Sequence, residues 1–167
     1  KQAEVSLGEI VPLVHDAIEE IRRISSNLWP SVLDDLGILA AINSLCSEFQ
    51  KTYSAIKVEK HVEVREQEIP PHLKVIIYRI LQEALTNVAK HSGATRTRVS
   101  LLKKDRQIEL LVEDNGRGGK YRHALFEGSG GIGICSMRNR AELSGGVFRI
   151  DSASGGGTSV LAAWPQQ

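Results

Sequence analysis

The sequence Asp114-Asn-Gly-Arg-Gly118 constrains the fold of this chain most strongly. An apolar run over residues 108–112 leads into it and predicts a buried strand that ends in a carboxylate. The two glycines that follow allow the backbone to turn sharply just after this carboxylate. Two further glycine clusters lie downstream, at residues 128–133 and 155–157. The pattern predicts an acidic side chain at the end of a strand, surrounded by turns that let another molecule approach the backbone.

A second polar feature lies upstream, on a predicted helix. Glu83 and Asn87 are four residues apart, so both side chains would lie on one face of that helix. An amide oxygen suits a hard cation such as Mg²⁺, which binds phosphate oxygens, waters and only one or two protein oxygens. Lys90 and His91 follow within one turn and would meet the phosphates. Together with Asp114, these residues predict a nucleotide pocket.

Each signal has a simpler interpretation when it is taken alone. Asp-Asn-Gly is also a common hairpin turn, so Asp114 by itself fits a turn as well as a pocket. In a pocket, its carboxylate would accept a hydrogen bond from the amino group of adenine and would reject guanine, because an unpaired buried group costs ~1–3 kcal/mol. Gly131-Ile132-Gly133 is expected to open a helix whose backbone N–H groups bind phosphate, although a flexible loop before a glycine cap has the same pattern.

Hydrophobic periodicity divides the chain into a helical start and an α/β body. Residues 7–28 predict an amphipathic helix that Pro30 interrupts. Asp34 and Asp35 are expected to cap the next helix. Residues 116–131 predict a long loop of the kind that often forms a lid. Helices are then predicted at 36–53, 71–92 and 134–143, and strands at 56–64, 98–103, 107–112, 147–150 and 159–164.

Composition and charge exclude several classes of function. The formal net charge is +1 and the basic residues are spread along the chain, which argues against direct nucleic-acid binding. No apolar run approaches the ~18 residues of a membrane span. Cys46 and Cys135 have no paired spacing and predict reduced, buried thiols in a reducing compartment. The chain starts at Lys1 without a methionine, so we expect a fragment whose parent protein reaches a membrane only through upstream segments.

These motifs resemble those of the Bergerat (GHKL) ATPase superfamily. Segments similar to its N box, G1 box, G2 box and terminal Gly-Thr motif lie at 81–91, 114–118, 128–141 and 155–158. Residues 20–37, the N box and the run Gly-Ile-x-x-Met-Arg-x-Arg resemble the NarL-partner class of sensor histidine kinases in particular. The resemblance implies an α+β Bergerat fold, a two-layer α/β sandwich with a mixed sheet, preceded by part of a helical dimerisation hairpin.

The resemblance also implies roles for individual residues. Asp114 would bind the adenine amino group, and Asn87 would coordinate Mg²⁺. Lys90 and His91 would contact the phosphates or the ribose. Glu83 would act as a general base, or would only orient Asn87 or a water. The remaining nucleotide contacts would come from glycine turns, from the start of a helix and from a threonine that supports the acid: Gly116, Gly118, Gly131, Ile132, Gly133 and Thr158.

The implied activity is transfer of the γ-phosphoryl group of ATP to a histidine, and then to an aspartate in the receiver domain of a response regulator. Residues 1–33 would be the C-terminal part of the dimerisation helices, and residues 34–167 the catalytic ATP-binding domain. The chain would form a homodimer through its N-terminal helix. This domain is expected in the cytoplasm, in a parent protein that an inner-membrane anchor could hold.

The position of the phospho-acceptor histidine follows from the same resemblance. His15-Asp16 has the residue types of an acceptor site, but it lies 15 residues before Pro30, inside what resembles the second helix of the hairpin. We therefore expect the acceptor on a helix upstream of Lys1, and not at His15. Two alternatives stay open at this point: a GHKL protein-serine kinase of the anti-sigma type, and a non-catalytic ATP-binding regulatory module.

Overall fold

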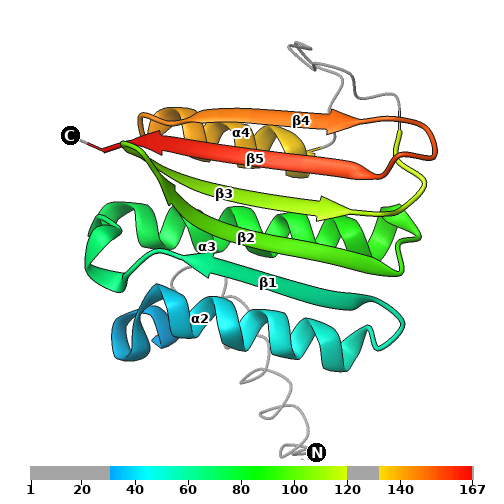
Figure 1. Cartoon of the computed structure of the whole chain (residues 1–167), viewed down its shortest axis with the longest axis horizontal. Coiled ribbons are helices and arrows are strands. Elements are labelled where there is room, and N and C mark those ends of the chain that lie inside the picture. The colour runs from blue at the N-terminus through cyan, green and yellow to red at the C-terminus, as the bar shows by residue number, and fades with distance from the viewer. Residues whose placement is uncertain (1–30, 120–131, 167) are drawn as a thin grey trace, which may run out of the picture.

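The structure is a computed structural model that describes residues 31–119 and 132–166 (Figure 1). The predicted helix at 7–28, His15 and most of the predicted lid lie outside these residues. Helices α3 and α4 lie behind a five-stranded sheet, and α2 lies beside α3, next to β1 (Figure 1). The elements are α2 (Ser31–Thr52), β1 (Lys57–Glu63), α3 (Pro71–Asn87), β2 (Arg96–Lys104), β3 (Gln107–Asp114), α4 (Ile132–Leu143), β4 (Val147–Ser152) and β5 (Thr158–Pro165).

The sheet is mixed, as predicted, with the strand order β1-β2-β3-β5-β4. β1 pairs with β2 in parallel, and the other neighbouring strands are antiparallel. A tight turn joins β2 to β3, and Asp105 in this turn has a positive φ of 51°. The register places Asp114, the last residue of β3, opposite Thr97 of β2 and Thr158 of β5. The end of β3 is therefore held from both sides.

Strand β3 shows why this carboxylate faces the helices. Side chains alternate between the two faces of a strand, so every second residue of β3 lies on the same face. Ile108, Leu110 and Val112 are buried on the face that packs against the helices. Asp114 is the next residue in this row and is only half-buried. An apolar row that ends in a carboxylate brings one charge to the edge of the core.

Helix α3 forms where the apolar spacing predicts it. It begins at Pro71, a residue tolerated in the first turn because the N–H that proline lacks would be unpaired there. Its buried face includes Leu73, Ile77, Ile80, Leu81 and Leu85. The helix continues into a π-helical turn (Val88–Ser92) and ends at Gly93, whose φ is 63°. The sequence pattern predicts the continuous helix and its glycine end, but not the wider last turn.

Helix α2 corrects the predicted cap. Asp34 and Asp35 lie inside the first part of the helix, so the prediction that they cap its start is wrong. The helix is instead broken at Gly37, which has φ 80° and ψ 174°. The N–H groups of Ile38 and Leu39 after the break donate to the carboxylate of Glu66, each at 3.1 Å.

Glu66 connects three parts of the chain. It lies in a short 3-10 turn (Glu66–Glu68), caps the second part of α2 and forms an ion pair with Lys74 of α3. Burial raises the pKa of Glu66, but the hydrogen bonds from Lys74 and from the N–H groups of Leu39 and Ile38 outweigh it, so the pKa is lowered overall. A side chain at Gly37 would meet this carboxylate. The break in α2 and its cap therefore depend on each other.

The two cysteines are both free. Cys46 of α2 is buried, and burial raises the pKa of its thiol to about 11, against a smaller opposing effect of Lys60. Cys135 of α4 is only partly buried, so the prediction of two buried thiols is confirmed for Cys46 alone. Among the described helices, none combines the length and the apolar character that crossing a membrane requires.

Replacing Glu66 by alanine should lower the free energy of unfolding by about 1–2 kcal/mol, because α2 loses an N-terminal cap. Since the pKa of Glu66 is lowered in the folded state, this stabilisation is present above the ordinary glutamate pKa and is lost as the pH falls through the folded pKa. Urea denaturation at neutral and at acid pH measures both effects. Gln67→Ala, at an exposed neighbour in the same turn, is the control. A loss of unfolding free energy in Glu66→Ala that is as large in acid as at neutral pH would contradict the capping role.

Candidate functional site

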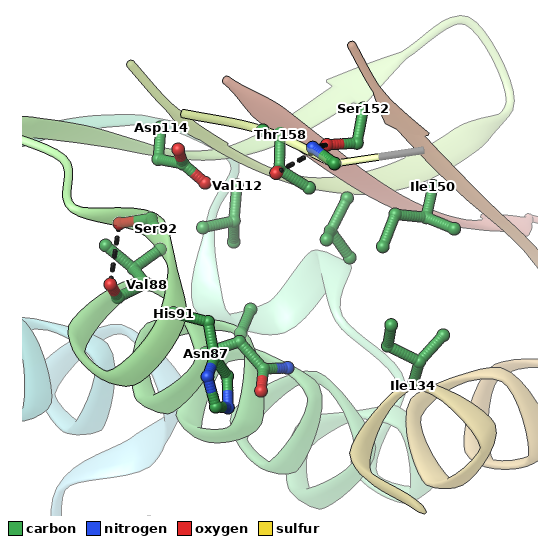
Figure 2. Close-up of a pocket in the computed structure, with 14 residues that line it drawn as sticks. Asn87, Val88, His91, Ser92, Val112, Asp114, Ile134, Ile150, Ser152 and Thr158 are labelled. Atoms are coloured by element: carbon green, nitrogen blue, oxygen red, sulfur yellow. Dashed lines mark hydrogen bonds between the residues drawn. The ribbon is translucent and has the colours of Figure 1, made fainter. Parts of the chain in front are cut away.

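A cavity of about 140 Å³ lies where the ends of β3, β4 and β5 face α3 and the start of α4 (Figure 2). An apolar cavity of about 150 Å³ holds benzene, so this one has the size of a flat aromatic ring. Its apolar walls come from Ala84, Val88, Val112, Ile134, Ile150 and Val160. Its polar lining comes from Asn87, His91, Ser92, Asp114, Ser152 and Thr158. The cavity is thus an apolar slot with a few polar groups at fixed places, as small-molecule sites commonly are.

Asp114 is the one acidic side chain among the described residues that line the cavity. Its Oδ1 accepts a hydrogen bond from the Gly116 N–H at 2.8 Å, and its carboxylate also accepts one from the backbone N–H of Thr158. Burial raises the pKa of Asp114, and these two hydrogen bonds offset only part of the rise. A carboxylate has about four acceptor positions. The Asp114 side chain can therefore accept a further hydrogen bond from a ligand.

The glycines near Asp114 are required by the packing of the protein itself. A Cβ at Gly116 would approach the carbonyl oxygen of Ser92 and would lie 2.8 Å from Asp114 Oδ1. A Cβ at Gly118, which has a φ of 60°, would collide with the carbonyl oxygen of Ala153. Gly118 lines the cavity, whereas Gly116 is buried beneath the carboxylate.

Thr158 and Ser152 form a hydroxyl pair on the sheet side of the cavity. The backbone of Thr158 bonds to Asp114, and its hydroxyl oxygen lies 2.9 Å from Ser152 Oγ (Figure 2). Ser152 Oγ also accepts from the Gly119 N–H at 2.8 Å. Sequence reasoning missed Ser152, because Asp-Ser-Ala-Ser-Gly reads as a loop. The signal was present, since Ser152 follows the buried Ile150 by two residues and so shares its face of β4.

The predicted residues of α3 and its last turn separate into two groups. Asn87 and His91 both line the cavity, on its helix side (Figure 2). Lys90 is exposed and does not line it. Glu83 also lies off the cavity, and its carboxylate rests against Gly133 in the first turn of α4, where a Cβ would collide with it. The structure therefore brings Asn87 and His91 to the same cavity as Asp114, and it places Lys90 and Glu83 outside it.

The start of α4 is only partly described. The helix begins at Ile132, as the glycine pattern predicts, but Gly131 lies outside the described residues. Ile132 is 92% exposed and Gly133 faces Glu83, so neither lines the cavity. Ile134, one residue further, forms part of its wall. The phosphate contacts expected from residues 131–133 stay a prediction.

Replacing Gly118 by alanine should destabilise the domain more than Gly155→Ala does. Both glycines have positive φ, but a Cβ at Gly155 would meet nothing within 4 Å. Gly155→Ala should therefore lower the free energy of unfolding only by the strain of a left-handed backbone, about 1–2 kcal/mol. Gly118→Ala adds a backbone collision, for which overpacking suggests a further ~1–3 kcal/mol. Urea denaturation of the two variants measures the difference, and equal losses would contradict the packing argument.

Comparison with known proteins identifies the family of this chain. Residues 73–167 match the family described as "Histidine kinase-, DNA gyrase B-, and HSP90-like ATPase". The sensor histidine kinase MctS of Rhizobium johnstonii is 32% identical over 98% of this chain and 35% of its own length. The oxygen sensor histidine kinase NreB of Staphylococcus carnosus is 35% identical over 89% of this chain and 42% of its own length. The chain thus spans less than half the length of these relatives.

Solved structures share the fold at low sequence identity. The histidine kinase domain of the blue-light activated histidine kinase from Erythrobacter litoralis EL346 has a TM-score of 0.61 at 23% identity, over 77% of this chain and 60% of that one. Histidine kinase AdeS of Acinetobacter baumannii has a TM-score of 0.64 at 12% identity, over 98% of this chain and 87% of that one. Because the family match covers more than half of its length, the chain belongs to the histidine kinase-, DNA gyrase B- and HSP90-like ATPase family and carries an ATP-binding catalytic domain homologous to those of sensor histidine kinases.

Proposed function

We propose that the domain recognises the adenine of ATP through Asp114 and presents the γ-phosphoryl group to a histidine of the same signalling protein. The observation that carries this proposal is the placement of one carboxylate in an apolar slot of aromatic size. Two backbone N–H groups hold that carboxylate in a fixed orientation. Its orientation is therefore set before any nucleotide arrives.

The chemistry of the slot fits adenine better than guanine. An ionised carboxylate only accepts hydrogen bonds, so it pairs with the exocyclic amino group of adenine. Guanine would present a carbonyl oxygen in the corresponding position, and two acceptors would face each other without a proton between them. Leaving such groups unpaired costs ~1–3 kcal/mol. Val112, Ile150 and Val160 supply apolar surface for the ring. Ile134 of α4 lies across the cavity from Ile150 (Figure 2).

We place the phosphate end of the nucleotide toward α3 and the start of α4. The Asn87 amide lines the same cavity as Asp114, and one amide oxygen meets the small requirement of Mg²⁺ for protein ligands beside phosphate. A bound Mg²⁺ would neutralise charge on the phosphate oxygens. His91 and Lys90, together with the N–H groups at 131–133, would contact the phosphates or ribose. Glu83, resting against the first turn of α4, would serve as a general base or would orient Asn87 or a water.

The proposed reaction is an in-line phosphoryl transfer to a neutral imidazole nitrogen. The protein supplies position and charge stabilisation, and little covalent chemistry. We place the acceptor histidine on a helix upstream of Lys1 and not at His15, with residues 1–33 as the end of the dimerisation helices of a homodimer. The phosphoryl group would then pass to an aspartate in a response-regulator receiver domain. The curated relatives are named histidine kinases, and no observation favours the serine-kinase or the non-catalytic alternative.

Asp114→Asn should weaken ADP binding by roughly 10- to 100-fold, which corresponds to the ~1.5–3 kcal/mol of a hydrogen bond to a charged group. The fold should survive, because the asparagine oxygen can still accept from Gly116. Since the pKa of Asp114 is raised in the folded state, its ionised form disfavours folding at neutral pH, and the melting temperature should stay equal or rise. Calorimetric titration with ADP and GDP measures the binding. Asp151→Asn, at an exposed carboxylate on β4, is the control, and undiminished ADP binding by Asp114→Asn would refute the proposal.

Incubation of the 167-residue chain with labelled ATP tests the position of the acceptor. We expect no acid-labile phosphate at His15, because the proposal assigns this residue to the second helix of the hairpin and the acceptor to the first. The measurement compares label on the wild-type chain with label on His15→Ala. Label that disappears in the variant would show that His15 is the acceptor.

A further inference from the structure

Arg117 connects several segments that surround the cavity without lining the cavity itself. Its backbone N–H donates to the carbonyl oxygen of Ser92 at 2.8 Å. Its side-chain Nε donates to the carbonyl oxygen of His91 at 2.9 Å. Its own carbonyl oxygen accepts from the N–H of Gly155 at 2.7 Å. One residue therefore holds together the end of α3, the loop after β3 and the connection between β4 and β5.

The two bonds to the end of α3 close a helix terminus. The last carbonyl groups of a helix have no partner within the helix and need one from elsewhere. At the π-helical turn Val88–Ser92, Arg117 supplies partners for the last two of these carbonyls. A cation at a helix C-terminus is also favourable because of the helix dipole. The bond from Nε is the charged one of the two and is the stronger kind.

This turn carries the residues proposed for the phosphate end of the nucleotide. His91 presents its side chain to the cavity, and its carbonyl oxygen is the group that Arg117 holds. Inside the turn, Ser92 Oγ donates to the carbonyl oxygen of Val88 at 2.6 Å. Gly116 packs so closely against the Ser92 carbonyl that a Cβ would not fit. The turn is thus fixed from within by Ser92 and from outside by the loop after β3.

The adenine end is held by other bonds. The Asp114 carboxylate receives its backbone hydrogen bonds from Gly116 and Thr158, and none from the Arg117 guanidinium. Removing the guanidinium leaves the backbone bond from Arg117 to Ser92 in place. Its loss should therefore loosen the turn that presents His91 to the cavity while leaving the adenine slot intact.

We propose that Arg117 is a positioning residue for the phosphate end of the nucleotide. Its guanidinium holds the carbonyl of His91 and thereby fixes the part of the π-helical turn that presents the His91 side chain to the cavity. This inference rests on the proposed function of the cavity. It assigns to the arginine of the Asp-Asn-Gly-Arg-Gly motif a role that acts through His91, and not through a contact of its own with the nucleotide.

The test compares ADP with adenosine, which lacks the phosphates. Arg117→Ala should weaken ADP binding by about five- to twentyfold, less than the full loss of a charged hydrogen bond because Arg117 is exposed and acts on the nucleotide only through His91, and should change adenosine binding by less than about twofold. Arg117→Gln, whose neutral side chain can still donate to a carbonyl, should recover most of the ADP affinity. Arg96→Ala removes an exposed arginine on β2 and is the matched control. Calorimetry measures ADP, and competition against a fluorescent adenine nucleotide measures adenosine.

A double-mutant cycle with His91→Ala tests the route of the effect. If Arg117 acts through His91, adding Arg117→Ala to His91→Ala should weaken ADP binding by less than about twofold more. Independent, multiplying losses would overturn the proposal in favour of a direct contact between the guanidinium and the phosphates. Equal losses for adenosine and ADP would overturn it in favour of general loosening of the domain. A wild-type chain that binds neither ligand would refute the proposed function of the cavity first, and this inference with it.

Discussion

The structure of the site depends on the two backbone N–H groups that hold the Asp114 carboxylate. One comes from Gly116, which can approach because it has no side chain. A Cβ at this position would meet the Ser92 carbonyl and the carboxylate itself. The other comes from Thr158, which the sheet register places directly opposite Asp114. The acid is thus oriented by the sheet and by a tight turn, and burial raises its pKa without removing its capacity to accept. A recognition group fixed in this way loses little conformational freedom when a ligand binds.

Local patterns were sufficient to predict most of the framework. The period-two alternation of β3 places Asp114 at the end of a buried row, and the helical period of α3 brings Asn87 toward the same space. The predictions that failed depend on contacts between distant residues. The cap of α2 comes from Glu66, which is 28 residues from Ile38 along the chain, and no local rule connects the two. Ser152 was missed because its hydroxyl forms hydrogen bonds with a loop and with a neighbouring strand, and the local sequence shows neither contact.

The glycines of the nucleotide motifs have a second physical meaning in this chain. Sequence reasoning assigns them to the close approach of a ligand. In the structure, side chains at Gly118 and Gly157 would collide with carbonyl oxygens of the protein itself, those of Ala153 and Asp114. These positions therefore preserve the turn geometry even in the absence of a nucleotide. A loss of binding in a glycine variant reports on the fold as well as on ligand contact, so binding and unfolding need to be measured together.

The parallel pairing of β1 with β2 has a mechanical consequence for the cavity. Two adjacent parallel strands require a crossover, and here the crossover segment contains α3. The helix that carries Asn87 is therefore tied at both ends to strands that are bonded to each other. It cannot swing away from the sheet as an independent element without stretching a connection or parting that strand pair. This wall of the cavity should therefore be about as rigid as the sheet edge. The free energy needed to open it should be closer to that of opening the sheet than to that of opening a surface loop.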